Sequence, residues 1–245
     1  MHKMTLAERL VVSADFENES SAVAVQKTLQ LANALQDTGV IIKSHTALRA
    51  YGYGLIDQIH DRGLKFFADL KLNDIPNTLR ADGRFLHDKK PDLLTVMASS
   101  GEESMKALVQ ELPETEILAV TVLTSFSRMD ATEIYGNMEV IEIVNHLAEI
   151  AYRSGVNGIV LSPQELDRIM MKKGFTYNTP GIRPSSCIIK NDDQSRCATP
   201  AEAIAAGATR IIIGRPITQS SDPRGAVEKI LKEIQGGLKM FEDRV

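Results

Sequence analysis

The stretch FFADLKLNDIPNT, residues 66–78, combines a buried strand, two charged residues and the beginning of a helix. Phe66–Lys71 is short and mostly apolar, which predicts a strand, and the apolar spacing over Asn77–His87 predicts an amphipathic helix. On a strand, Asp69 and Lys71 point to the same side, opposite their leucine neighbours. The stretch therefore predicts a strand–helix unit that carries two charges at the carboxyl end of its strand.

Units of this kind recur along the whole chain. The predicted strands are Leu10–Ala14, Val40–Lys43, Phe66–Lys71, Leu93–Met97, Ile117–Leu123, Gly158–Leu161, Tyr177–Thr179 (a weak pattern) and Arg210–Ile213. The predicted helices are Ala22–Gln36, Asn77–His87, Glu102–Leu112, Val140–Arg153, Gln164–Lys172, Pro200–Ala206 and Arg224–Ile234. Alternation of strands and helices implies a parallel sheet, and eight units of roughly 30 residues fill the chain. We therefore expect an α/β fold, a (β/α)8 TIM barrel forming a single domain over residues 1–245.

The composition narrows the classes of function. The 245 residues carry 28 Lys and Arg against 32 Asp and Glu, a net charge of −4, and 43% are hydrophobic. This balance argues against a nucleic-acid-binding protein, and the longest apolar run, Ile117–Leu123, is too short to span a membrane. Cys187 and Cys197 have no metal-binding spacing, so we expect free thiols, no metal site and a soluble, cytoplasmic protein.

Charged residues follow the first three predicted strands. Asp15, Lys43, Asp69 and Lys71 stand at strand ends, where the functional residues of a barrel lie. Buried together, these charges are stable only if they pair with one another, so a catalytic row and a structural ion-pair network both fit the pattern. Asp74 lies past its strand and fits either the site or the N-terminal cap of the next helix.

The last predicted strand leads into a phosphate-binding pattern. In TRIIIGRPIT, residues 209–218, Gly214 allows close backbone approach to an anion and Arg215 offers a planar guanidinium. Loops after the seventh and eighth strands of barrels often bind phosphate. The long polar connection over residues 179–200 has the length and composition of a functional loop. We therefore expect a phosphate site at this end of the barrel.

The residues quoted above match a known family. DLKLNDIPNT, residues 69–78, resembles the D-x-K-x-x-D-I-x-x-T signature of orotidine 5′-phosphate decarboxylases. Asp15 and Lys43 follow their strands as in that family, and the resemblance continues through TPGIR, DDQSR and GATRIIIGRPI. It covers the chain from about Leu10 to Ile217 in the expected order.

The resemblance implies a reaction without metal or organic cofactor, the last step of de novo UMP synthesis. Orotidine 5′-monophosphate would lose CO₂ to give uridine 5′-monophosphate. Lys71 would protonate the C6 carbanion, and Asp69 would lie near the departing carboxylate. Two further residues would complete the charged array: Lys43 of the same subunit and Asp74 of a partner subunit. A carbanion without an electron sink requires stabilisation by preorganised charge, which suits these residue types.

The resemblance also implies the substrate contacts and a homodimer with shared active sites. Asp74, Ile75 and Thr78 would reach into the site of the partner subunit. The residues implied to bind substrate are Asp15, Ile75, Thr78, Thr124, Pro180, Arg183, Gln194, Gly214 and Arg215.

Two other functions remain open at this point. One is the function of a metal-dependent relative similar to 3-keto-gulonate-6-phosphate decarboxylase. That enzyme shares the motif D-x-K-x-x-D, but this alternative does not explain the segments DIPNT and DDQ. A barrel that binds nucleotide phosphates without catalysis is the other alternative, although every member of the charged row is present. Many relatives have a glycine two residues after the lysine of the second strand, whereas this chain has His45 there, in the sequence Lys43-Ser44-His45. We favour a packing role for His45 over a role as general base.

Overall fold

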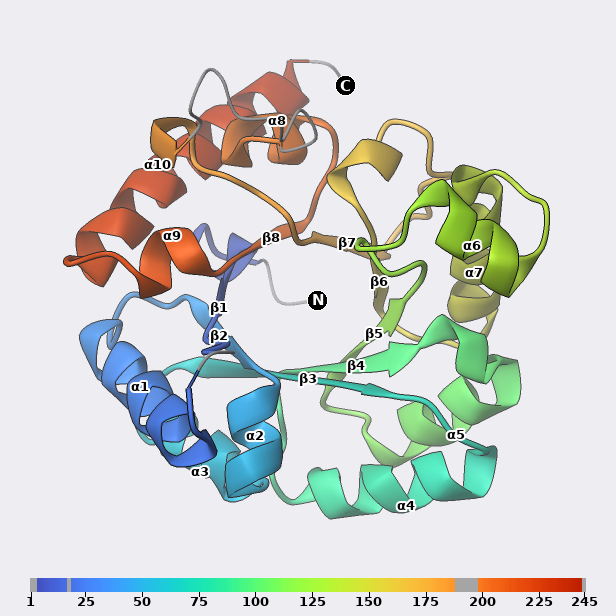
Figure 1. Cartoon of the computed structure of the whole chain (residues 1–245), viewed down its shortest axis with the longest axis horizontal. Coiled ribbons are helices and arrows are strands. Elements are labelled where there is room, and N and C mark those ends of the chain that lie inside the picture. Colours follow the sequence, from blue (N-terminus) through green and yellow to red (C-terminus); the bar gives the residue numbers. More distant parts are fainter. Residues whose placement is uncertain (1–3, 17–18, 188–197, 244–245) are drawn as a thin grey trace.

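The computed structural model describes residues 4–16, 19–187 and 198–243, and its strands form one closed parallel barrel (Figure 1). The strands are β1 (Leu10–Ser13), β2 (Ile41–Ser44), β3 (Lys65–Leu72), β4 (Leu93–Met97), β5 (Glu116–Val120), β6 (Gly158–Val160), β7 (Thr176–Thr179) and β8 (Arg210–Ile213). Each strand pairs with the next, and β8 closes the ring on β1. The eight predicted strands and the (β/α)8 fold are confirmed.

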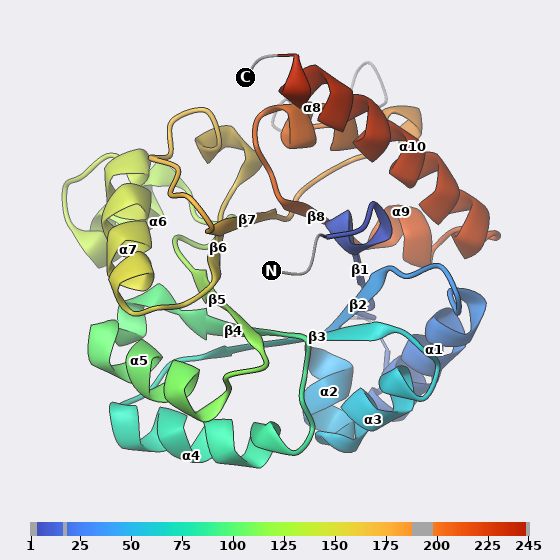
Figure 2. The ribbon, with the colours of Figure 1, turned by 180° about the vertical axis from the view of Figure 1, so that it is seen from behind.

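The helices surround this ring, as the views from both sides show (Figures 1 and 2). They are α1 (Ser21–Ala34), α2 (Thr46–Tyr51), α3 (Gly54–His60), α4 (Pro76–His87), α5 (Glu102–Glu111), α6 (Arg128–Tyr135), α7 (Val140–Arg153), α8 (Pro200–Ala205), α9 (Arg215–Thr218) and α10 (Pro223–Glu242). None of the helices in the described part of the chain is both long and apolar enough to cross a membrane.

Apolar residues of the strands build two layers of core. Alternate strand residues point to opposite faces, so Val11 packs inside the barrel whereas Leu10 and Val12 pack outward against the helices. The inner layer consists of Val11, Ile41, Phe67, Leu93, Leu118, Val120, Val160 and Ile212. Because this layer fills the barrel, the centre of the ring is a packed core and the polar side chains are confined to its two ends.

One end of the barrel is held by a buried ion pair. Arg210, at the start of β8, donates from two guanidinium nitrogens to the carboxylate of Glu116 on β5, at 2.7 and 2.6 Å, and to Asn178 on β7 at 3.2 Å. Arg210 and Glu116 are the first residues of β8 and β5, and Asn178 lies opposite Arg210 in the pairing of β7 with β8. Arg210 therefore joins β8 to β5, through its bidentate pair with Glu116, and to β7, through Asn178, at the end of the barrel opposite the predicted site.

The helices of the structure differ from the predicted ones in two ways: one predicted helix does not form, and several short helices were not predicted. No α-helix spans Gln164–Lys172; a 3₁₀ helix over Pro163–Glu165 is followed by turns. There the N–H of Met170 donates to the side chain of Asn145 on α7 at 3.0 Å, so a tertiary contact replaces a helical hydrogen bond. The unpredicted helices α2, α3, α6 and α9 are only four to eight residues long, too short for apolar periodicity to reveal.

Candidate functional site

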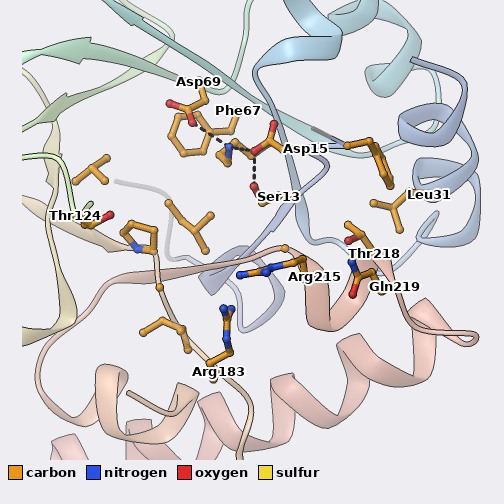
Figure 3. A pocket seen from close by; sticks show the side chains of 18 of the residues that line it. Ser13, Asp15, Leu31, Phe67, Asp69, Thr124, Arg183, Arg215, Thr218 and Gln219 are labelled. Atoms are coloured by element: carbon orange, nitrogen blue, oxygen red, sulfur yellow. Dashed lines mark hydrogen bonds and ion pairs between the residues drawn. The ribbon is translucent and has the colours of Figure 1, made fainter. Parts of the chain in front are cut away.

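A cavity of about 1170 Å³ opens at the carboxyl ends of the strands (Figure 3). Nine of the predicted site residues line it: Asp15, Lys43, Asp69, Lys71, Thr124, Pro180, Arg183, Gly214 and Arg215. They come from segments that lie up to 200 positions apart in the chain. The closed barrel brings them together because β8 lies beside β1 and the strand ends share one rim.

The four charged residues form a continuous row across β1, β2 and β3. The ammonium nitrogen Nζ of Lys43 lies 2.5 Å from Asp15 Oδ2 and 2.9 Å from Asp69 Oδ2. The other oxygen of Asp69, Oδ1, lies 2.8 Å from Lys71 Nζ. Each carboxylate therefore alternates with an ammonium group, as the sequence predicts for a mutually paired row.

Burial and charge act in opposite directions on this row. Burial alone would raise the pKa of Asp69, but the charges of Lys43 and Lys71 hold that pKa well below its usual range. Burial alone would lower the pKa of Lys43, yet Asp69 and Asp15 raise it. Asp15, Lys43 and Asp69 therefore keep their charges near neutral pH, although Lys43 and Asp69 are each only 6% exposed.

The backbone of β3 departs from a regular strand at the row. Lys71 has φ of +48°, in the left-handed region that residues other than glycine rarely adopt. The pairing of β3 with β4 also shifts register between Ala68 and Leu72. Asp69 and Lys71 both line the cavity, as predicted. Their orientation depends on a bulge in the strand as well as on the alternation of side chains along it.

Two residues that sequence reasoning missed hold the row in place. Ser13 donates its hydroxyl to Asp15 Oδ2 at 2.7 Å, and Thr95 on β4 donates its hydroxyl to Asp69 Oδ1 at 2.8 Å. Thr95 is the single polar residue in the strand LLTVM, and this interruption of an apolar run is the signal that could have identified it.

His45 also contacts the row, through its backbone. Its N–H donates to Asp15 Oδ1 at 3.1 Å. Burial, together with the charges of Arg49 and Lys71, lowers the pKa of the His45 ring, so the ring is neutral at pH 7. This contact with Asp15 uses the backbone alone and does not depend on the imidazole ring.

Two arginines face the cavity on the side opposite the charged row. The guanidinium groups of Arg183 and Arg215 point toward the same part of the cavity (Figure 3). Neither forms an ion pair with a carboxylate in the part of the chain that the structure describes. Gly214 follows β8 and precedes the single turn α9, and a Cβ at this position would lie 3.4 Å from Ser13. This corner of the cavity has free positive charge, as an anion-binding site requires.

The remaining predicted site residues do not line this cavity. Asp74, Ile75 and Thr78 lie at the beginning of α4, where Ile75 is 64% exposed. Asp74 accepts a hydrogen bond from the N–H of Ile75 at 2.7 Å, but the N-terminal cap residue of α4 is Ile75, so a capping role for Asp74 is wrong. Gln194 lies outside the described residues.

No metal site is evident among the residues that the structure describes. Over residues 4–16, 19–187 and 198–243, no three His, Cys, Asp or Glu side chains are grouped closely enough to hold a metal ion. The three acidic residues that line the cavity are paired with lysines: Asp15 and Asp69 with Lys43, and Glu19 with Lys27.

The fold and the site define a (β/α)8 barrel with a charged, anion-accepting cavity at the carboxyl end of its strands. The chain belongs to the orotidine 5′-phosphate decarboxylase / HUMPS family, whose model matches residues 8–230.

Individual relatives agree with this assignment. The chain is 34% identical over 231 residues to the orotidine 5′-phosphate decarboxylase of Chromohalobacter salexigens, covering 92% of this chain and 95% of that protein. It is 38% identical over 188 residues to the enzyme of the same name from Thermobifida fusca, covering 76% and 80%. The crystal structure of orotidine 5′-phosphate decarboxylase from Lactobacillus acidophilus superposes with a TM-score of 0.75 at 32% identity, covering 93% of this chain and 99% of that one.

Proposed function

We propose that this protein decarboxylates orotidine 5′-monophosphate to uridine 5′-monophosphate, in pyrimidine biosynthesis. The observation that carries the proposal is one cavity that joins the alternating row from Asp15 to Lys71 with the free guanidinium of Arg215. The membership of the family supports the same reaction.

The row supplies the chemistry at the reacting carbon. When the bond between C6 and the carboxylate breaks, CO₂ leaves and the electron pair stays on C6. The ammonium of Lys71 stabilises this negative charge, then gives C6 a proton and becomes a neutral amine that solvent reprotonates. Asp69, 2.8 Å from Lys71 Nζ, holds the ammonium in place before the reaction.

The rest of the cavity holds the substrate. Lys43 and Asp15 bind the ribose hydroxyls, Thr124 and Pro180 contact the pyrimidine, and Arg215 with the Gly214 N–H binds the phosphate. Gln194 and Arg183, from the connection over residues 179–200, complete the contacts. Energy from phosphate binding, remote from C6, is then available to lower the barrier of the reaction.

We also propose that the active enzyme is a homodimer in which each subunit lends Asp74, Ile75 and Thr78 to its partner. These residues lie outside their own subunit's cavity, next to apolar side chains that are open to solvent. Ile75, the N-terminal cap residue of α4, is 64% exposed, and Phe85 on α4 is 72% exposed. A second copy of the chain would cover these apolar side chains and bring its Asp74 to the row.

The direct test of the function is an assay on orotidine 5′-monophosphate in excess EDTA, following the loss of its ultraviolet absorbance. We expect full activity, because every step uses side chains of the chain itself. Activity that disappears with EDTA and returns with Mg²⁺ would instead support a metal-dependent sugar-phosphate lyase. Tight binding of uridine 5′-monophosphate without turnover would support a non-catalytic barrel. A cytoplasmic location fits a charged nucleotide substrate that does not cross membranes unaided.

Replacing Arg215 by alanine is expected to raise the KM for orotidine 5′-monophosphate by at least about 100-fold, because two charge-assisted hydrogen bonds to phosphate are lost. Steady-state kinetics with the nucleotide measures this effect. Orotidine, which has no phosphate, should be an equally poor substrate for both proteins. Arg224→Ala is the matched control, since Arg224 lies on α10 outside the cavity. Equal losses with orotidine and with the nucleotide would contradict the role of Arg215.

A further inference from the structure

The pairing between β3 and β4 is interrupted beside the charged row. Ala68 pairs with Leu94 and Leu72 pairs with Val96, so β3 has three residues where β4 has one, Thr95. The three residues are Asp69, Leu70 and Lys71, and they include both charged members of the row that β3 contributes. Thr95 therefore faces a bulge of two extra residues.

The hydroxyl of Thr95 makes two hydrogen bonds across this bulge. It accepts from the backbone N–H of Lys71 at 2.9 Å and donates to Asp69 Oδ1 at 2.8 Å. Thr95 is 1% exposed, so water does not compete for either bond. The hydroxyl uses its one proton and one lone pair, a combination that the isosteric valine side chain lacks.

We propose that Thr95 is a positioning residue for the decarboxylation, which fixes the Lys71 backbone and the Asp69 carboxylate relative to each other. This inference rests on the proposed function. The N–H of Lys71 has left its place in the strand ladder and needs an acceptor, because a buried unpaired N–H is costly. Thr95 supplies that acceptor and so holds Lys71 at φ of +48°.

The same hydroxyl sets the orientation of Asp69. Oδ1 accepts from both Thr95 and Lys71 Nζ, which leaves Oδ2 for Lys43. Without the hydroxyl, the carboxylate is free to rotate and the Lys71 ammonium moves with it. A displacement of about 1 Å at a reacting group costs roughly 100-fold in rate, so the effect falls on the chemical step.

The test compares Thr95→Val, which removes the hydroxyl at constant shape, with Thr95→Ser, which keeps it. We expect Thr95→Val to lower kcat about 10- to 100-fold while the KM changes less than about threefold, because the phosphate site is untouched. Thr95→Ser should stay within about threefold of wild type for both constants.

A second buried threonine provides the control for loss of packing or stability. Thr121, fully buried just after β5, donates its hydroxyl to the carbonyl of Val160 at 3.0 Å and does not touch the row. Thr121→Val should keep the wild-type kcat and KM. If Thr95→Val folds poorly, Thr95→Ala takes its place in the same comparison, with thermal denaturation measured for every variant.

Three results would overturn the positioning role. They are a wild-type kcat in Thr95→Val, an equal loss of kcat in Thr121→Val, and a Thr95→Ser variant as impaired as Thr95→Val. Absence of decarboxylation by the wild-type protein would instead reject the proposed function. In that case, the affinity of wild type and Thr95 variants for uridine 5′-monophosphate still reports whether the hydroxyl organises the cavity.

Discussion

Replacing Lys71 by alanine is expected to lower kcat/KM for orotidine 5′-monophosphate by at least about 10⁴-fold, because one side chain serves both as proton donor and as the nearest positive charge to the carbanion. The affinity for uridine 5′-monophosphate should change less than about fivefold, since Arg215 and Gly214, the proposed phosphate contacts, lie elsewhere in the cavity. Single-turnover kinetics and calorimetric titration with the product measure the two quantities separately.

The control for this variant is Lys65→Ala. Lys65 begins β3, so it lies on the same strand, and it pairs with Glu8 away from the cavity. This variant should retain the wild-type kcat/KM. Decarboxylation by Lys71→Ala at the wild-type rate would show that the proton and the stabilising charge come from another group, and the mechanism would have to be abandoned.

Mixed dimers of two inactive variants should recover activity. In a dimer of one Lys71→Ala chain and one Asp74→Asn chain, one site carries both substitutions and the other carries none. We therefore expect each variant alone to be nearly inactive and the purified mixed dimer to have about half of the wild-type activity. Co-expression of chains with two different affinity tags, followed by purification on both, provides the mixed dimer for the assay.

The matched control is the mixed dimer of Lys71→Ala with Lys43→Ala. Both lysines belong to the row of one subunit, so every site in this dimer lacks one of them. It should remain inactive. A Lys71→Ala/Asp74→Asn dimer that is no more active than its parents, or a monomeric wild-type protein at assay concentration, would contradict the shared site.

The barrel was predictable because each strand carries a local signal. Burial on both faces makes the strands apolar, and turns or polar residues end each run, so even the weak pattern at Tyr177–Thr179 identified β7. The cavity residues were predictable for a related reason. In a parallel barrel all strands end on the same rim, so polar residues at strand ends such as Lys43 and Arg215 must meet.

The features that were missed depend on contacts between distant segments. The bulge at Lys71 becomes visible only when β3 is paired with β4, since nothing in the local sequence distinguishes it from a regular strand. The expected helix over Gln164–Lys172 failed for a similar reason, because Asn145 on a neighbouring helix takes a backbone N–H. Apolar periodicity records which residues are buried, and it carries no information about which partner satisfies a backbone group.

The closure of the ring by β8 has a consequence for synthesis of the protein on the ribosome. The proposed phosphate site at Gly214 and Arg215 follows the last strand, about 200 residues after the row begins at Asp15. A ligand stabilises only the folded state that binds it. Substrate in the cell therefore cannot stabilise a nascent chain until β8 has emerged from the ribosome. Until then, the first seven strands must remain soluble through their own packing or with the assistance of chaperones.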